Sequence, residues 1–99
     1  MTAAAATAVP TAKRNSRLLQ IGGLTLAGTG VAHFVKPALF EGITKQAFPR
    51  NTATYIRING GLETAIGLGL AVPSARKFAV IGAIGYVAYL GANIARNAT

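Results

Sequence analysis

Three long apolar runs, separated by short basic segments, constrain this chain more than any other feature of its sequence. The runs cover residues 18–35, 55–72 and 78–94, about 17–18 residues each. A helix that crosses a bilayer needs roughly 17–25 predominantly apolar residues. Only helices and closed barrels satisfy their backbone hydrogen bonds in lipid, and these runs lack the alternation of barrel strands. The sequence therefore predicts an all-α membrane protein with three transmembrane helices. A soluble helical bundle is the alternative, because the first two runs contain many glycines and polar atoms.

The composition and the placement of charge favour the membrane class. Hydrophobic residues make up 52% of the chain and charged residues 12%, whereas soluble domains carry about 25% charged residues. The ten Lys and Arg residues lie in short clusters between the runs, which is typical of charges that flank a membrane and argues against a nucleic-acid-binding face. The chain has no cysteine, which excludes disulfides, thiol redox chemistry and iron–sulfur clusters.

The runs also predict the domain organisation and the topology. Residues 1–16 are expected to be a disordered basic tail, and residues 17–96 a single three-helix transmembrane domain. The dense basic cluster before the first run favours a cytoplasmic N-terminus, although five basic residues fall on each side of the membrane. We expect a multi-pass protein of a bacterial inner membrane.

The segment between the first two runs, residues 37–48, is predicted to be a short amphipathic helix in the membrane interface. Apolar residues recur there every four positions, and prolines stand at its start and just after its end. Phenylalanines on this helix are expected to enter the headgroup boundary. An irregular loop is the alternative. The residues assigned to this helix are Pro37, Phe40, Ile43 and Phe48.

Small residues at three- and four-residue spacing indicate how the helices meet. Lipid tails are as apolar as leucine, so membrane helices associate through close packing and polar contacts. The second run is especially rich in such positions. Packing within the chain is the leading interpretation, and a homodimer face is the less favoured one. The positions predicted to contact a neighbouring helix or a partner are Asn59, Gly60, Gly61, Glu63, Ala65, Gly67 and Gly69.

Glu63 stands near the centre of the second run, and the chain has only one other acid, Glu41. A charge at this depth costs about 2.5–3.5 kcal/mol on insertion scales, so it is expected to face a partner or a cavity. His33 and Arg57 complete a possible polar site around it. Glu63 is interpreted as a structural acid that fixes helix register, as the partner of a cation on another subunit, or as a residue that relays protons or binds a ligand. One His and two Glu without Cys build no closed metal site, and no catalytic set or cofactor motif is visible.

Several motifs together resemble the small bacterial DoxX-like membrane proteins. They are "HFVKPALF", Pro49, "YIRINGGLETAIGLGLAVP", Arg76 and a terminal "ANI", within about residues 17–95. The resemblance implies a multi-pass helical protein, typically with four helices, some of whose relatives are tied to quinone-linked or thiol-linked oxidation. This chain stops where the fourth helix is expected, and the absence of cysteine weakens a thiol-oxidation role. The positions that match the family pattern are His33, Pro37, Tyr55, Gly60, Glu63, Gly67 and Asn93.

These observations predict a non-enzymatic accessory subunit that docks its helices against a larger membrane complex and needs no cofactor. Its partners are expected to be other membrane-protein subunits and the lipid bilayer. An actinobacterial envelope lipid-transport assembly of the MCE type is the first candidate complex, and a respiratory complex is the second. The alternative is a DoxX-like, quinone-associated oxidoreductase or proton-handling protein that uses His33 and Glu63.

Overall fold

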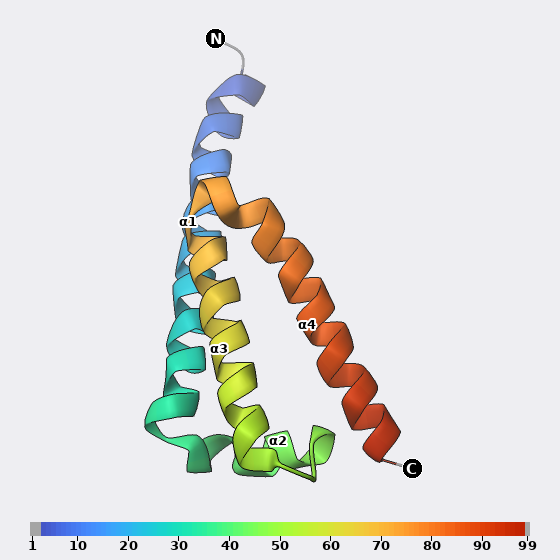
Figure 1. The fold of residues 1–99 in the computed structure, drawn as a ribbon. Coiled ribbons are helices and arrows are strands. Elements are labelled where there is room, and N and C mark those ends of the chain that lie inside the picture. Colours follow the sequence, from blue (N-terminus) through green and yellow to red (C-terminus); the bar gives the residue numbers. More distant parts are fainter. Residues whose placement is uncertain (1–2, 99) are drawn as a thin grey trace.

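The computed structural model describes residues 3–98, with side chains from Arg14 onward, and its regular structure is entirely helical (Figure 1). This confirms the all-α prediction for the described part of the chain. In chain order the elements are α1 (Ala3–Val35), the 3-10 turn η1 (Pro37–Phe40), α2 (Glu41–Ala47), α3 (Thr52–Ala71), the 3-10 turn η2 (Pro73–Ala75) and α4 (Arg76–Asn97).

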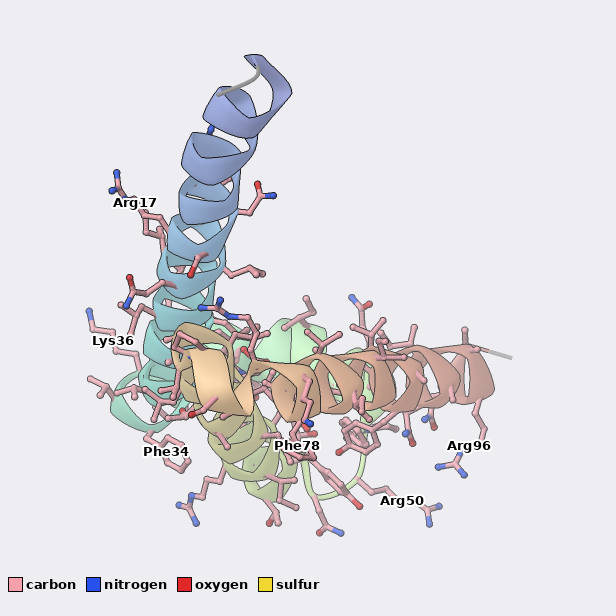
Figure 2. All side chains as sticks on the ribbon, turned by 90° about the horizontal axis from the view of Figure 1, so that it is seen from above. Arg17, Phe34, Lys36, Arg50, Phe78 and Arg96 are labelled. Atoms are coloured by element: carbon pink, nitrogen blue, oxygen red, sulfur yellow. The ribbon has the colours of Figure 1, made fainter. Side chains whose placement is uncertain are left out.

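The helices form a tight pair and a diverging arm. α1 and α3 lie side by side and antiparallel, whereas α4 starts beside the end of α3 and moves away from it along its length (Figure 1). The short α2 lies across the wide end, where it contacts both α3 and α4. Seen from above, α4 projects away from α1, and the labelled basic side chains point outward (Figure 2). The molecule is therefore a wedge, closed at one end by η2 and crossed at the other by α2.

Prolines and one asparagine set the corners of the wedge. Pro37 and Pro73 each open a 3-10 turn, since proline lacks the amide proton that a continuing helix needs. Asn51 precedes α3 with φ 57°, a left-handed conformation that asparagine tolerates better than most residues. At the closed end, Arg76 Nε donates to the Leu70 carbonyl at 2.7 Å, and its Nη1 donates to Ser16 Oγ at 3.2 Å. One side chain thus connects α1, α3 and α4.

Among the residues that the structure describes, two helices are long and apolar enough to cross a membrane: Arg14–Val35 within α1, and Pro73–Asn97, which includes α4. Many of their apolar side chains are exposed; Phe78, Ile81 and Ile84 are 66%, 68% and 67% exposed. The predicted third span is a helix of 20 residues, α3, but it does not meet the same test. It carries Arg57, Asn59 and Glu63, whose polar side chains lower its hydropathy.

The N-terminal segment differs from the prediction. We expected residues 1–16 to be a disordered tail, but α1 begins at Ala3, so the helix includes residues 3–16. The run of four alanines from Ala3 explains the early start in part, because alanine has the highest intrinsic helix propensity. Residues 1 and 2 of the expected tail lie outside the described part of the chain.

The helical segment predicted over residues 37–48 is present as η1 followed by α2, but the side chains that face inward are not the expected ones. Phe40 and Phe48 were expected to face headgroups. Instead, Phe48 is 6% exposed and the Phe40 ring stacks on His33 with 3.7 Å between centroids. Leu39 and Ile43 are the exposed apolar side chains, at 70% and 65%. Both phenylalanines find aromatic or apolar partners within the wedge, which explains the reversal.

Candidate functional site

The site is positioned by backbone contact between α1 and α3, which only glycine permits. A Cβ atom on Gly30 would lie 2.6 Å from the Gly60 carbonyl oxygen, and one on Gly60 would lie 2.8 Å from the Gly30 carbonyl oxygen. About two turns along the bundle, Gly67 packs against Gly23 and Ala27 in the same way. Such small residues let membrane helices approach closely. The contact at Gly60 brings His33 of α1 against α3, three residues before Glu63.

Glu63 is the centre of a hydrogen-bonded cluster that three helices contribute to. The Tyr86 hydroxyl of α4 donates to Glu63 Oε2 at 2.5 Å. His33 Nε2 of α1 lies 3.7 Å from the same oxygen, within ion-pair distance but too far for a good hydrogen bond. The Glu63 side chain is 12% exposed and that of His33 is 5% exposed. The predicted proximity of His33 and Glu63 is thus observed, and Tyr86 joins them from the third helix.

His33 is held in one orientation by its other ring nitrogen. Nδ1 lies 2.8 Å from the Thr29 carbonyl oxygen, which can only accept a hydrogen bond, so Nδ1 carries a proton. The ring also stacks on Phe40, with an interplanar angle of 17°. Nε2 is therefore the ring nitrogen that is left to face Glu63. A proton placed between the two groups can sit on either one, giving imidazolium and carboxylate or imidazole and carboxylic acid.

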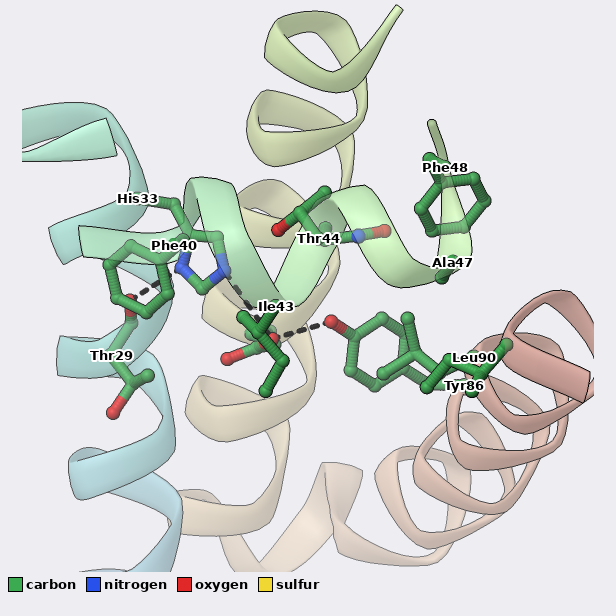
Figure 3. A pocket seen from close by; sticks show the side chains of 12 residues that line it. Thr29, His33, Phe40, Ile43, Thr44, Ala47, Phe48, Tyr86 and Leu90 are labelled. Atoms are coloured by element: carbon green, nitrogen blue, oxygen red, sulfur yellow. Dashed lines mark hydrogen bonds and ion pairs between the residues drawn. The ribbon is translucent and has the colours of Figure 1, made fainter. Parts of the chain in front are cut away.

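A cavity of about 270 Å³ opens beside this cluster, between the α1–α3 pair, α2 and α4. His33, Thr44 and Tyr86 point into it from α1, α2 and α4 (Figure 3). Most of its wall is apolar, as in ligand pockets with a few placed polar groups. The lining residues are Thr29, His33, Phe40, Ile43, Thr44, Ala47, Phe48, Asn59, Glu63, Tyr86, Leu90 and Ile94.

A second polar contact joins α3 to α4 about one turn nearer the open end. The Tyr89 hydroxyl donates to Asn59 Oδ1 at 3.1 Å. The Phe48 ring lies beside Tyr89 and stacks on Tyr55, with ring centroids 5.3 Å and 4.1 Å away. Farther along α4, Asn97 Nδ2 donates to the Ala47 carbonyl of α2 at 2.8 Å. Polar and aromatic contacts therefore connect α4 to the bundle where the helix backbones have separated.

The structure brings together only some of the predicted site residues. Asn59, Gly60 and Gly67 are buried in the helix contacts, and Gly69 faces Ala79 of α4. Gly61 and Ala65 are exposed, and nothing lies within 4 Å of a Cβ built on Gly61. The packing stripe of α3 is thus the one through Gly60, Thr64, Gly67 and Ala71.

Arg57, which we had placed in the polar site, is exposed and does not line the cavity. It lies six residues before Glu63, so the helix turns it to another face. Asn59, predicted as a contact to a neighbouring helix, accepts a hydrogen bond at Oδ1 from Tyr89 of α4. Within the described residues, no group of three or more His, Cys, Asp or Glu gathers in a way that could hold a metal ion.

Sequence reasoning missed the α4 side of the site. Away from Arg76 at the closed end, Tyr86 and Tyr89 supply the hydrogen bonds from α4 to α3 that are found among the described residues, and Asn93 donates to the Tyr89 carbonyl at 2.8 Å. A signal was present, because Tyr86, Tyr89 and Asn93 stand at positions i, i+3 and i+7, one face of a helix. Thr44 was missed as well, since its hydroxyl looks like an ordinary surface group in an amphipathic segment.

The chain matches a protein family described as a domain of unknown function (DUF8561) over residues 22–98, and it belongs to that family. The matched region includes all of the cavity. No curated protein and no solved structure matches the chain.

Proposed function

We propose that this member of a family of unknown function is a non-enzymatic accessory subunit that docks against other helices of a larger membrane complex. The observation that carries the proposal is the outer face of α4. Of the residues in α4, all of which the structure describes, only Ala79 is buried. The face of α4 that points away from α2 and α3 is therefore open to lipid or to another protein.

An exposed flank of α4 has the small residues through which membrane helices associate. Gly85, Ala88 and Ala92 are exposed and stand at three- and four-residue spacing, roughly a third of a turn around the helix from the face that carries Tyr86 and Asn93. Nothing lies within 4 Å of a Cβ built on Gly85. The glycines of the α1–α3 contact show what such a stripe does when a helix covers it. We name Gly85, Ala88 and Ala92 the α4 stripe.

In this proposal α1, α3 and α4 all cross the membrane, with α3 as the third span. α3 packs along α1, and its polar residue Glu63 faces His33 and Tyr86 instead of lipid, which lowers the cost of placing it in a bilayer. A bacterial inner membrane is the proposed location. An envelope lipid-transport assembly of the MCE type is the first complex to test, and a respiratory complex is the second.

Affinity purification in a gentle detergent, at native expression, tests the proposal. The protein should co-purify with a constant set of membrane subunits, and Ala88→Leu should abolish that association. Val87→Leu is the matched control, because Val87 is exposed beside the stripe and the change adds one methylene there. Migration of the protein alone, or only as a homo-oligomer, would show the proposal to be wrong.

The second candidate is a proton-handling protein of the DoxX-like kind, favoured by the cluster of His33, Glu63 and Tyr86. These three groups form a connected path from α1 to α4 at the cavity wall. Glu63→Gln separates the candidates. Lost proton-coupled activity with assembly intact favours chemistry at the cluster, whereas lost assembly or accumulation favours the accessory role.

A further inference from the structure

The cavity presents hydrogen-bond acceptors that the protein itself leaves unused. Glu63 Oε2 accepts from Tyr86, but among the described residues nothing donates to Glu63 Oε1. The hydroxyl of Thr44, on the facing wall, also has no hydrogen-bond partner among these residues. Both residues line the cavity, and neither Glu63 Oε1 nor Thr44 Oγ1 is fully buried. A carboxylate oxygen accepts only, so its natural ligand is a donor.

His33 supplies a third acceptor when it is neutral. Its Nδ1 keeps a proton for the Thr29 carbonyl, which leaves a lone pair on Nε2. Nε2 lies 3.7 Å from Glu63 Oε2, and both residues line the cavity. Three acceptors on three elements thus surround one space: His33 on α1, Thr44 on α2 and Glu63 on α3.

The charges around Glu63 show what this space accepts. α1 contributes His33 and α4 contributes Tyr86, while the lining residues of η1 and α2 carry no titratable group. Arg57 and Lys45, the nearest cations on α3 and α2, are exposed and do not line the cavity. With His33 neutral and Glu63 ionised, the site carries one net negative charge. Since uncompensated charge is costly inside a bilayer, the site is neutral when it holds one proton or one monovalent cation.

The remaining walls suit an aliphatic or aromatic tail. They are built by Phe40, Ile43, Phe48, Leu90 and Ile94. Ile43 and Ile94 are 65% and 38% exposed, so the apolar wall continues to the outer surface between α2 and α4. A polar head bound at Glu63 can therefore extend its tail toward lipid.

We propose that this cavity binds the protonated head of a lipophilic primary amine in exchange for the proton that His33 and Glu63 share. A primary ammonium group has three N–H donors, one for each of Glu63 Oε1, Thr44 Oγ1 and His33 Nε2. In the exchange one ammonium ion enters and one proton leaves, so the site stays neutral. The inference does not depend on whether a partner helix covers α4.

The exchange is tested with octylammonium as the probe and octanol as its uncharged match. The protein is reconstituted in phosphatidylcholine nanodiscs, and binding is measured by calorimetry against empty nanodiscs. The chain has three tyrosines and no tryptophan, so tyrosine fluorescence reports on the site independently. We expect saturable binding of octylammonium, at least about tenfold weaker binding of octanol, and weaker ammonium binding as the pH is lowered. Titrations in two buffers of different ionisation enthalpy should show release of about one proton per ligand bound.

Two variants and one control decide the assignment. Glu63→Gln should weaken octylammonium binding roughly 30-fold or more, because it removes the buried charge partner. Thr44→Val, which keeps the carboxylate, should weaken it about three- to tenfold. Glu41→Gln removes the only other acid, which is exposed on α2, and should leave affinity unchanged.

Equal binding of octanol and octylammonium, or binding without proton release, would overturn the proposal. So would wild-type affinity in Glu63→Gln. Circular dichroism shows whether the Glu63→Gln protein is folded. If it is not, Thr44→Val decides, and an unchanged affinity in that variant contradicts the three-acceptor site.

Discussion

The α1–α3 contact and the α3–α4 contact use the same kinds of residue in opposite proportions. Between α1 and α3, glycines remove the side chains that would keep the backbones apart, as at Gly30 and Gly60. Between α3 and α4 such contact occurs at Gly69 and Ala79, near the closed end of the wedge. Farther along, the helices diverge and hydrogen bonds take over, from Tyr86 to Glu63 and from Tyr89 to Asn59.

The difference shows that small residues join helices whose backbones lie close together, whereas polar residues join helices whose backbones are farther apart. A glycine contact works only where backbones almost touch, whereas a tyrosine reaches across a gap and brings a hydroxyl to its end. The gap that the tyrosines cross is also the gap that contains the cavity. Divergence of α4 therefore creates the cavity that Glu63 lines. A tightly packed α4 would bury the acid without giving it access.

The largest expected effect is in the α1–α3 contact. Gly67→Val should destabilise the protein by about 3 kcal/mol, because even its Cβ would press on the backbone of Gly23 and Ala27. Gly61→Val is the matched control on the same helix, where nothing lies within 4 Å of a Cβ. Its effect should stay below about 1 kcal/mol. Unfolding by denaturing detergent, followed by far-ultraviolet circular dichroism, measures both, and similar losses in the two variants would contradict the packing described.

The next effect concerns the polar bridge to α4. Tyr86→Phe should destabilise the protein by about 1.5 kcal/mol, because the lost hydrogen bond ends on a carboxyl group that is left without its donor. Tyr55→Phe removes a hydroxyl for which no hydrogen bond is found among the described residues, and it keeps the stack on Phe48. It should change stability by less than about 0.5 kcal/mol. Spin labels on α3 and α4 should also report wider separation in Tyr86→Phe, and an unchanged distance distribution would argue against the bridge.

A smaller loss is expected at the neighbouring bridge. Tyr89→Phe removes a neutral hydrogen bond to Asn59 and should cost about 0.6 kcal/mol, the average for hydrogen bonds between membrane helices. The same unfolding assay measures it. A loss larger than that of Tyr86→Phe would reverse the ranking of the two bridges and move the main α3–α4 connection away from Glu63.

Much of the helical layout followed from the sequence, because long apolar runs and flanking prolines act locally. The predicted runs 55–72 and 78–94 correspond to α3 and α4 within three residues at each end. The proximity of Glu63 and His33 was also predictable, since a buried acid needs a partner and the chain offers few. The choice of packing stripe was not, because Gly60–Gly67 and Gly61–Gly69 are each about two helical turns apart and both fit a helix contact. Only the rotation of α3 against α1 distinguishes them.

The cavity was beyond prediction for a related reason. Its shape depends on the angle at which α4 leaves η2, which no local pattern encodes. Phe40 and Phe48 were therefore assigned to the headgroups, although they line a space inside the wedge. Spacing identified which side chains share a face, and the angle between helices determined what that face meets.

The smallest expected effect is at the exposed surface of α4, and there the substitution should raise stability instead of lowering it. Gly85→Ala should stabilise the isolated protein by about 0.5 kcal/mol, because alanine is the better helix former and a Cβ at this position meets nothing within 4 Å. The same change at Gly30 should destabilise, since its Cβ would lie 2.6 Å from the Gly60 carbonyl oxygen. The unfolding assay should be run with and without the co-purifying subunits. If Gly85→Ala destabilises the isolated protein, α4 packs on a surface of this chain that the structure leaves open. If the stabilisation turns into a loss only when the partner is present, the α4 stripe is the docking face.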